Sequence, residues 1–540
     1  MSGLLRRLRA EPDRWLILVT TLAWASLLVV YSVLTPVWRS PDEASHFDLV
    51  LDVADGRGYA DWDTDRLSEG VLDASAPVRT APPRAPIEPR ARPPALPPVE
   101  DSSDQSTAAN HMTQHPPAYY WTVGAVLALA QEVGLAPPSV SGQLAVARVL
   151  SAILLVPVPS LAWAVARLLG GGPGVRRLAL VAPLAVPGLA QVGSGVTNDV
   201  LSVLLFSALA VVLAAYVRGR RSLGVCVGAG ALCGAALFTK AFGAAAVPWA
   251  LLVVLASWRM GERDRVLRHS LAITAVAFVT GGWWYLRNLV RDGRLLPSIE
   301  EARFSSQSPL AGADKSLGEW LHRFTPVAGR GFFGLFGYAD VAISDRVYHA
   351  ALALGIVGVV AGLVAVRRSR PELVLLAAPL PLLLALQASQ SFRLYERSGV
   401  VALGHGRYLM PAIVPVVVLI ALGVARPSWP GGWRAAPVAL MVAVAAHLHA
   451  ASRLLDFYWA DGGGMDAVRV ATAWSPLPHA MAMGAFMATG ALLLLLLVLL
   501  LRDPDRRAAT AAGTPTPIGA ARRGAPRPAP VARGTTLPSP

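Results

Sequence analysis

The stretch from Trp15 to Asp48, WLILVTTLAWASLLVVYSVLTPVWRSPDEASHFD, changes character at its centre. Its first part, 15–35, carries no charged residue, and a helix needs about 20 apolar residues to cross a bilayer. Directly after it come two acids and a histidine, Asp42, Glu43 and His46. We therefore expect a membrane helix that delivers ionisable side chains to one face of the bilayer.

The composition indicates an integral membrane protein. Of the 540 residues, 54% are hydrophobic and 15% are charged, whereas about a quarter of a soluble domain is charged. Long apolar runs recur at 15–35, 118–133, 145–168, 177–195, 199–217, 222–239, 241–257, 267–286, 347–366, 372–389, 407–425, 435–451 and 479–501. The predicted fold class is an all-α polytopic membrane protein with about 12–13 transmembrane helices.

The formal net charge of +14 does not indicate a nucleic-acid partner. The arginines gather in 502–540 and in short loops between apolar runs, which is the positive-inside pattern. No basic patch is interleaved with aromatic residues, as single-strand binding requires. Cys226 and Cys233 share one apolar run, where a helix would hold them about 10 Å apart. That distance is too long for a disulfide, so we expect two small core residues.

The basic loops predict the orientation of the chain, with both termini in the cytoplasm. The expected order is a cytoplasmic N-terminus 1–14, an uncleaved anchor 15–35, an extracytoplasmic loop 36–117 with a Pro-rich insert 77–98, a transmembrane core 118–286, a second extracytoplasmic loop 287–346, transmembrane helices 347–501 and a disordered basic cytoplasmic tail 502–540. Thirteen spans would place the tail outside. We interpret 118–133 as half-inserted or interfacial, because it is short and ends in Gln131 and Glu132. Thirteen spans are the alternative.

This orientation places many polar residues on the outer side of the membrane. They are Asp42, Glu43, His46, His115, Asn198, Asp199, Lys240, Arg287, Asn288, Arg346, His405, Arg407 and Tyr408. Ionisable groups at membrane depth are costly, so they are candidates for function. Asp42 and His46 are four residues apart and would share a helix face, where they and Glu43 could hold a divalent metal such as Mg²⁺ or Mn²⁺.

Each candidate also has a purely structural interpretation. Ser40 is a good N-cap, Pro41 suits the first helical position, and Glu43 completes a capping box. Asp42 would gain about 0.3–1 kcal/mol from the helix dipole, and Gly56 could end the helix. Asn198 and Asp199 could cap the helix 199–217. Lys240 and Arg287 could be boundary residues that reach the head groups, and His115 could be plain loop.

Several motifs together resemble the GT-C glycosyltransferases, which include the protein mannosyltransferases and the aminoarabinose transferase that modifies lipid A. The resemblance rests on PDEASHFD (41–48), HPPAYYW (115–121), ARVLSAILLVPV (147–158) and TND (197–199). Three further motifs, GGWWYLRN (281–288), GFFGLFGY (331–338) and GHGRYLMP (404–411), are similar to a bacterial membrane-protein branch at the border of that superfamily. The resemblance covers residues 15 to about 425, and the Pro-rich insert is not part of the pattern.

The resemblance implies a plasma-membrane enzyme that moves a sugar from a polyprenyl-phosphate donor to a cell-envelope lipid, glycan or protein, with inversion. Asp42, with Glu43 beside it, would supply the general base. Asp199 would orient the acceptor or hold a metal. The donors to the leaving phosphate would be Lys240, Arg287, Arg346 and Arg407, and His115 would position phosphate or sugar. The sequence contains no P-loop or Rossmann fingerprint, which agrees with a reaction that uses no nucleotide.

Two other functions stay open from the sequence. A transporter or flippase of a polyprenyl-linked lipid would place its ionisable groups near mid-bilayer in repeated halves. Here they stand at helix ends on one side, and no internal repeat is visible. A non-catalytic protein that binds polyprenyl lipids would need the same motif residues without turnover.

Overall fold

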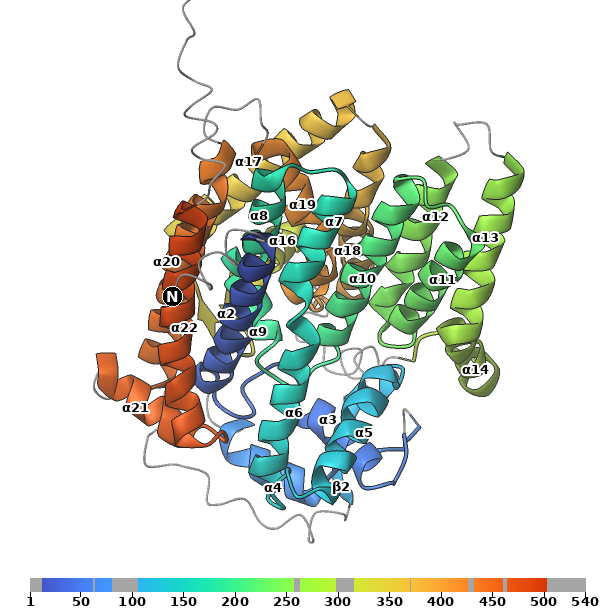
Figure 1. Cartoon of the computed structure of the whole chain (residues 1–540). Coiled ribbons are helices and arrows are strands. Elements are labelled where there is room, and N and C mark those ends of the chain that lie inside the picture. Colours follow the sequence, from blue (N-terminus) through green and yellow to red (C-terminus); the bar gives the residue numbers. More distant parts are fainter. Residues whose placement is uncertain are drawn as a thin grey trace, which may run out of the picture. The chain divides into compact units, whose positions relative to one another are not determined.

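The computed structural model describes residues 12–61, 64–79, 105–256, 263–297, 315–369, 371–425, 432–459 and 464–502 (Figure 1). The expected N-terminal arm 1–14, the Pro-rich insert 77–98 and the tail 502–540 lie largely outside these residues. The helices up to Leu500 form one unit.

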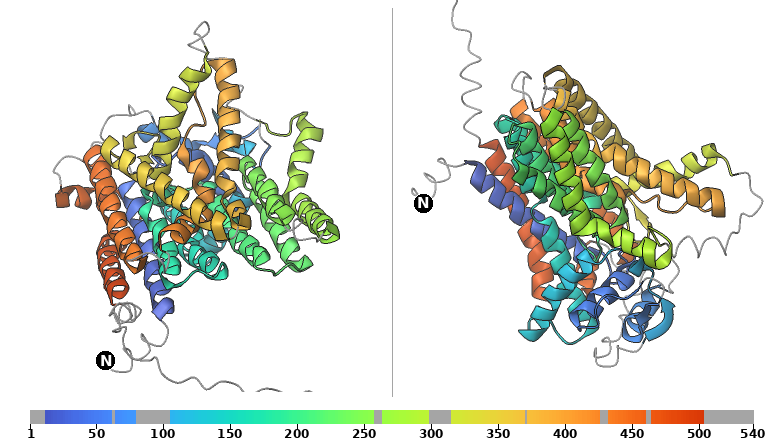
Figure 2. Two further views of the ribbon diagram at one scale, coloured as in Figure 1. Left: turned by 90° about the horizontal axis from the view of Figure 1, so that it is seen from above. Right: turned by 90° about the vertical axis from the view of Figure 1, so that its right-hand side faces the viewer.

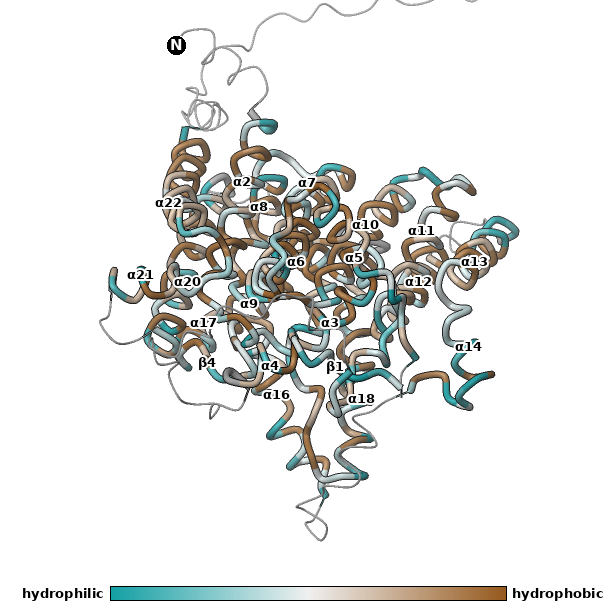
Figure 3. Tube along the Cα trace, turned by 90° about the horizontal axis from the view of Figure 1, so that it is seen from below, coloured by the Kyte–Doolittle hydropathy of each residue, from teal (hydrophilic) through white to brown (hydrophobic). Residues whose placement is uncertain are grey.

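Eight helices within the described ranges are long and apolar enough to cross a membrane. They are α2 (Pro12–Leu34), α6 (Val140–Leu155) continued by α7 (Val158–Leu168), α10 (Asp199–Val217), α17 (Asp345–Ser369), η7 (Pro371–Ala377) continued by α18 (Pro379–Ser398), η8 (Gly406–Ala412) continued by α19 (Ile413–Val424), α20 (Ala435–Tyr458) and α22 (His479–Leu501). The prediction of an all-α polytopic membrane protein is confirmed. Figure 3 shows hydrophobic residues along most of α2 and α22.

The other expected runs are shorter or broken. The run 177–195 divides into α8 (Pro173–Val181), η3 (Ala182–Ala185) and α9 (Pro187–Val192), because Pro183 and Pro187 cannot donate helical hydrogen bonds. The runs 222–239 and 241–257 form α11 (Leu223–Leu237), η4 (Ala241–Ala245) and α12 (Ala246–Ala256). The run 267–286 forms α13 (Arg263–Ala277), a π-helical turn η6 (Phe278–Gly282) and α14 (Trp283–Asp292). Among the described residues, long apolar helices are therefore fewer than the thirteen apolar runs.

The expected first extracytoplasmic loop folds into a small module, named the outer module here. It contains α3 (Glu43–Ala54), β1 (Arg66–Ser68), α4 (Glu69–Arg79), β2 (Gln105–Ala109) and η2 (His111–Gln114). β1 and β2 pair antiparallel, with Arg66 opposite Ala109 and Ser68 opposite Gln105. The module lies at one end of the long helices, with α5 beside α3 (Figures 1 and 2).

α5 (Ala118–Glu132) has 15 residues and packs on α3. A crossing helix needs about 20 residues, and the placement of 118–133 as a half-inserted or interfacial segment stays a prediction. Gly124 permits the close packing, since an added Cβ would lie 2.7 Å from the Val53 side chain.

The remaining elements complete the frame around the site. They are α16 (Leu317–Phe333), β3 (Leu335–Phe336) paired with β4 (Val341–Ala342), η9 (Gly432–Arg434) and α21 (Gly464–Trp474). Cys226 and Cys233 are buried and free, as expected. The polypeptide between α2 and α3 then determines where the acids of the first motif stand.

Candidate active site

The turn between α2 and α3 carries two non-glycine residues in the left-handed region. Trp38 has φ 66° and Asp42 has φ 61°, a conformation that costs of order 1–3 kcal/mol unless its surroundings enforce it. The backbone N–H of Trp38 donates to Glu43 Oε2 at 2.9 Å, and that of Asp42 donates to the Tyr338 hydroxyl at 3.0 Å. The strained turn is thus held from both sides, and it aims the Asp42 side chain.

Glu43 holds this turn through a buried ion pair. Its carboxylate accepts from Arg148 Nε at 2.7 Å and from Arg148 Nη2 at 2.6 Å, and both side chains are buried. Arg148 also donates to the carbonyls of Ser32, Thr35 and Pro36 at the end of α2, at 2.9–3.1 Å. This network connects α2, α3 and α6 in one place.

The structure corrects two expectations for this stretch. The N-cap of α3 is Asp42 rather than Ser40, and its side chain makes no capping hydrogen bond. Glu43 makes no capping box, because Arg148 takes both of its oxygens. The backbone N–H of Val196 also donates to Glu43, at 3.2 Å. Glu43 is therefore occupied as a brace and does not face the cavity as a catalytic group.

Four chain segments bring two acids and two cations together next to this turn. Arg407 of η8 donates to Asp42 Oδ2 at 2.8 Å, and its Nε lies 3.5 Å from Asp199 Oδ2. Lys240, between α11 and η4, donates to Asp199 Oδ1 at 2.6 Å. Asp199 begins α10. We name Asp42, Asp199, Lys240 and Arg407 the paired cluster.

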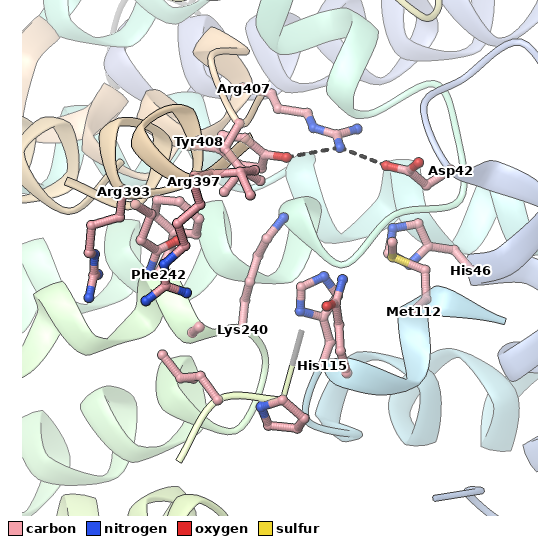
Figure 4. Close-up of a pocket in the computed structure, with 17 residues that line it drawn as sticks. Asp42, His46, Met112, His115, Lys240, Phe242, Arg393, Arg397, Arg407 and Tyr408 are labelled. Atoms are coloured by element: carbon pink, nitrogen blue, oxygen red, sulfur yellow. Dashed lines mark hydrogen bonds and ion pairs between the residues drawn. The ribbon is translucent and has the colours of Figure 1, made fainter. Parts of the chain in front are cut away.

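The paired cluster stands beside a cavity of about 290 Å³ (Figure 4). Six of the expected residues line it: Asp42, His46, His115, Lys240, Arg407 and Tyr408. Phe242 stacks on Tyr408 with ring centroids 4.8 Å apart, and Lys240 Nζ stands 4.7 Å from the same ring. The cavity therefore offers a carboxylate, cations and an aromatic wall in one space.

The two histidines of the cavity are neutral. Burial lowers the pKa of His46 to about 3. Burial and the charge of Lys240 hold the pKa of His115 well below its usual range. The two rings stack with centroids 6.5 Å apart, and His46 Nδ1 lies 2.9 Å from the Tyr120 hydroxyl. They can hydrogen-bond to a ligand without adding positive charge.

The partners of Asp42 favour its charged form. Burial raises the pKa of Asp42, but the hydrogen bond with His111 and the charge of Arg407 outweigh it and hold that pKa well below its ordinary value. Burial lowers the pKa of Lys240, and Asp199 opposes that effect. Asp42 is thus an anion that has two partners in this state.

Several expected binding residues lie elsewhere. Asp199 contacts Lys240 but lines only a small void behind the cavity, together with His405. Arg287 binds Asp61 at 2.9 Å and stacks on Trp284. The other three are Asn198 and Asn288, which are buried outside the cavity lining, and Arg346, which is exposed.

The structure also adds residues that sequence reasoning missed. Gln390, Arg393 and Arg397 of α18 line the cavity. Their spacing of three and four residues places them on one helix face, a signal that was readable in QASQSFRLYER. His111 contacts Asp42 Oδ1 through Nε2 at 3.3 Å. Arg148 was detectable as a charge inside an apolar run.

The expected metal ligands do not form a site. Glu43 is saturated by Arg148, and Asp42 is paired with Arg407. A cation placed between Asp42 and His46 would meet the charges of Arg407 and Lys240, which face the same cavity. The donor set therefore does not fit a divalent ion, and no step of the reaction below uses one.

No family model and no curated protein matches the chain. Among solved structures it is similar to ArnT from Cupriavidus metallidurans bound to undecaprenyl phosphate, at 16% identity and a TM-score of 0.42 over 94% of this chain and 81% of that one. The apo state of that ArnT matches at 15% identity and a TM-score of 0.46, over 93% and 80%.

An oligosaccharyltransferase of Archaeoglobus fulgidus, tethered to an acceptor peptide, matches at 14% identity and a TM-score of 0.40, over 86% of this chain and 57% of that one. Both matched proteins belong to the GT-C superfamily, which the sequence motifs resemble. TM-scores below 0.5 at such identities carry no argument about this chain. Its own site residues have to support a function.

Proposed function

We propose that this protein is a membrane glycosyltransferase of the GT-C type, which moves a sugar from a polyprenyl-phosphate donor to an acceptor hydroxyl. One observation carries the proposal: an ionised carboxylate, Asp42, faces a cavity together with Lys240 and Arg407. A base and two phosphate donors within one space are what the reaction needs. The cavity stands where the first membrane helix ends.

Asp42 acts as the general base. The acceptor oxygen attacks the anomeric carbon, its proton passes to an Asp42 oxygen, and the bond from that carbon to the phosphate oxygen breaks. A single displacement of this kind inverts the anomeric centre. The electron pair leaves with the polyprenyl phosphate, where Arg407 and Lys240 stabilise the charge.

The Asp42–Arg407 pair explains how a low-pKa carboxylate becomes a base. In the free protein Arg407 lies 2.8 Å from Asp42 and holds its pKa down. A donor phosphate competes for the same guanidinium. As Arg407 turns to the phosphate, Asp42 loses a partner and its pKa rises toward the range of an effective base. Binding of the donor thus activates the base.

The second acid, Asp199, positions the cations. It contacts both Lys240 and Arg407, so it fixes where the two positive charges stand. The apolar side of the cavity, which includes Phe242, Leu296 and Leu394, suits the first isoprene units of a lipid. Arg393 and Arg397 stand at the same cavity and suit an anionic donor or acceptor.

The proposed location rests on the positions of the basic loops in the sequence. The protein resides in the plasma membrane with both termini in the cytoplasm, and its cavity opens on the outer face. The acceptor is a lipid, glycan or protein of the cell envelope. The charged groups stand at helix ends on one side, which favours a transferase over a carrier that shuttles ions through mid-bilayer.

Donor turnover tests the proposal. Purified protein is supplied with a panel of polyprenyl-phosphate sugars and a cell-envelope extract, and release of free polyprenyl phosphate is measured. We expect turnover of one donor by the wild type and its loss in Asp42→Asn. Asp73→Asn, which changes an exposed acid of the same outer module, is the matched control and keeps activity.

Two outcomes would contradict this. Turnover that survives Asp42→Asn would remove Asp42 as the base. Binding of a polyprenyl phosphate without turnover of any donor would make the protein a lipid-binding or lipid-moving protein.

A further inference from the structure

A second group of acids lies on the outer module, outside the cavity. Asp48 and Asp52 are four residues apart on α3 and so share a face. Asp65 stands directly before β1. One carboxylate oxygen of each of the three lies within 4.8 Å of the others. We name Asp48, Asp52 and Asp65 the outer triad.

The outer triad carries more negative charge than its surroundings neutralise. Asp48 and Asp65 are 1% and 3% exposed. Among the described residues neither carboxylate forms an ion pair with Lys or Arg. Arg57 binds Asp52 at 2.7 Å, but it is shared with Asp55 at 3.0 Å. The charges of Arg57 and Arg66 reach Asp65 without forming an ion pair with it, and a buried charge without a direct partner is unfavourable.

An independent observation concerns a single oxygen atom. Asp65 Oδ2 is buried and has no hydrogen-bond partner within the part of the chain that the structure describes. Its other oxygen accepts from Gln105 Nε2 at 3.3 Å. A buried acceptor without a donor lacks a compensating interaction. A bound cation supplies it, because carboxylate oxygens are the ligands that hard divalent cations take.

The environment of Asp48 also favours a bound cation. Its carboxylate accepts from Ser68 N at 3.1 Å, Ser68 Oγ at 2.6 Å and Asn110 Nδ2 at 3.1 Å. These neutral donors fix the carboxylate without neutralising it. Burial and the neighbouring Asp52 raise the pKa of Asp48 to about 7 and that of Asp65 to about 6. Both shifts reflect the cost of burying negative charge next to other carboxylates.

We propose that Asp48, Asp52 and Asp65 bind one divalent cation, with Ca²⁺ preferred. Ca²⁺ takes six to eight oxygen ligands at about 2.3–2.6 Å in flexible geometry, and oxygens within 4.8 Å of one another can share such an ion. Mg²⁺ demands stricter octahedral geometry and keeps several waters. The outer side of a membrane supplies Ca²⁺.

The cation would act as a structural clamp. It joins α3, which carries His46 and follows Asp42, to the β1–β2 ladder and to Asn110 beyond it. His111 and His115 follow directly on that ladder. The site is separate from the paired cluster, and its existence does not depend on the transferase activity proposed above.

Calcium binding to the whole purified protein tests this site without an activity assay. Protein freed of metal by a chelator is titrated with CaCl₂ at pH 7.5, by calorimetry and by thermal unfolding. We expect one Ca²⁺ per chain and a rise in the unfolding temperature. Asp65→Asn should weaken binding by about tenfold or more, while Asp73→Asn on the same module should leave it unchanged.

A further readout separates metal from protons and covers the case of poorly folding variants. Asp65→Asn removes one repelling charge, so without Ca²⁺ it should unfold at the same or a higher temperature than the wild type. If Ca²⁺ leaves the wild type unchanged while acidification from pH 7.5 to 6 stabilises it, the triad holds protons and the proposal fails. It also fails if Asp65→Asn and Asp48→Asn bind Ca²⁺ like the wild type.

Discussion

The paired cluster and the outer triad solve the problem of buried acids in opposite ways. In the paired cluster Asp42 and Asp199 each contact a cation, with Arg407 reaching both and Lys240 on Asp199. In the outer triad only Asp52 forms an ion pair with a described residue, Arg57, which it shares with Asp55. The first arrangement keeps acids ionised and ready for chemistry. The second leaves charge for an external partner to neutralise. Burial alone therefore does not indicate what an acid does.

The largest expected effect concerns the acid that faces the cavity. Asp42→Asn keeps the volume of the side chain but removes the base, so turnover should fall by about 10²–10⁴-fold. Release of polyprenyl phosphate measures it. Asp48→Asn, assayed with Ca²⁺ absent, is the matched comparison from the outer triad. An equal loss of activity in both variants would contradict the separation of roles.

The next effect concerns the buried ion pair between Glu43 and Arg148, beside the paired cluster. Arg148→Met leaves Glu43 charged and buried without its partner, which should lower the free energy of unfolding by about 3–5 kcal/mol. Thermal or denaturant unfolding in detergent measures the change. The double variant Glu43→Leu/Arg148→Met should recover part of the loss. If the double variant were no more stable than Arg148→Met, the pairing would not be the cause.

Removing a cation from the paired cluster should have a smaller effect. Lys240→Met removes one donor to the leaving phosphate, and such a loss lowers turnover by about 10²–10³-fold. Asp199 keeps Arg407 nearby, so the fold should survive. The initial rate at saturating donor reports the effect. Arg291→Met, which changes an exposed arginine bound to Asp61, serves as the control and should keep the wild-type initial rate.

The smallest effect concerns the pH dependence of stability. Burial raises the pKa of Asp48 to about 7 from an ordinary 3.8, so the folded protein binds more protons than the unfolded chain between these values. Metal-free protein should lose stability as pH rises through this window, with a slope from this group of at most about 1.4 kcal/mol per pH unit. His46 acts in the opposite direction below its ordinary 6.5, because its folded pKa is about 3.

The difference between wild type and Asp48→Asn isolates the contribution of that acid. Unfolding curves at several pH values, with and without Ca²⁺, supply it. Saturating Ca²⁺ should flatten the difference, because the ion replaces the proton. A difference that is independent of pH would mean that Asp48 is ionised throughout.

Much of the site could be predicted because its members stand at the ends of apolar runs that the basic loops assign to one side of the membrane. Asp42, His46, His115, Lys240 and Arg407 line one cavity, as the common membrane side suggested. The positive-inside pattern and the cost of charge in lipid carry that inference. It places residues on a face of the membrane but does not say which of them touch.

Two of the misplaced residues, Glu43 and Arg287, have one physical cause in common, a partner far away in the sequence. Glu43 fits a local capping box, yet Arg148, 105 positions later, outcompetes a backbone N–H for its carboxylate. Arg287 fits a phosphate ligand, yet Asp61 binds it from 226 positions away. Arg393 and Arg397 were missed for another reason, because α18 continues beyond the apolar run 372–389 from which it was predicted. Local rules cannot weigh such distant competitors.

The anchoring of Glu43 has a consequence for the geometry of a lipid-tethered substrate. Because Arg148 clamps Glu43 to the last carbonyls of α2, the height of Asp42 above the hydrocarbon core is set by the membrane helix and not by the outer module. Changes elsewhere in the outer module therefore need not move the Asp42 carboxylate, provided that they keep the contact between His111 and Asp42. In the proposed transferase, the acceptor side of the site could then vary while the base keeps its position relative to a lipid-tethered donor.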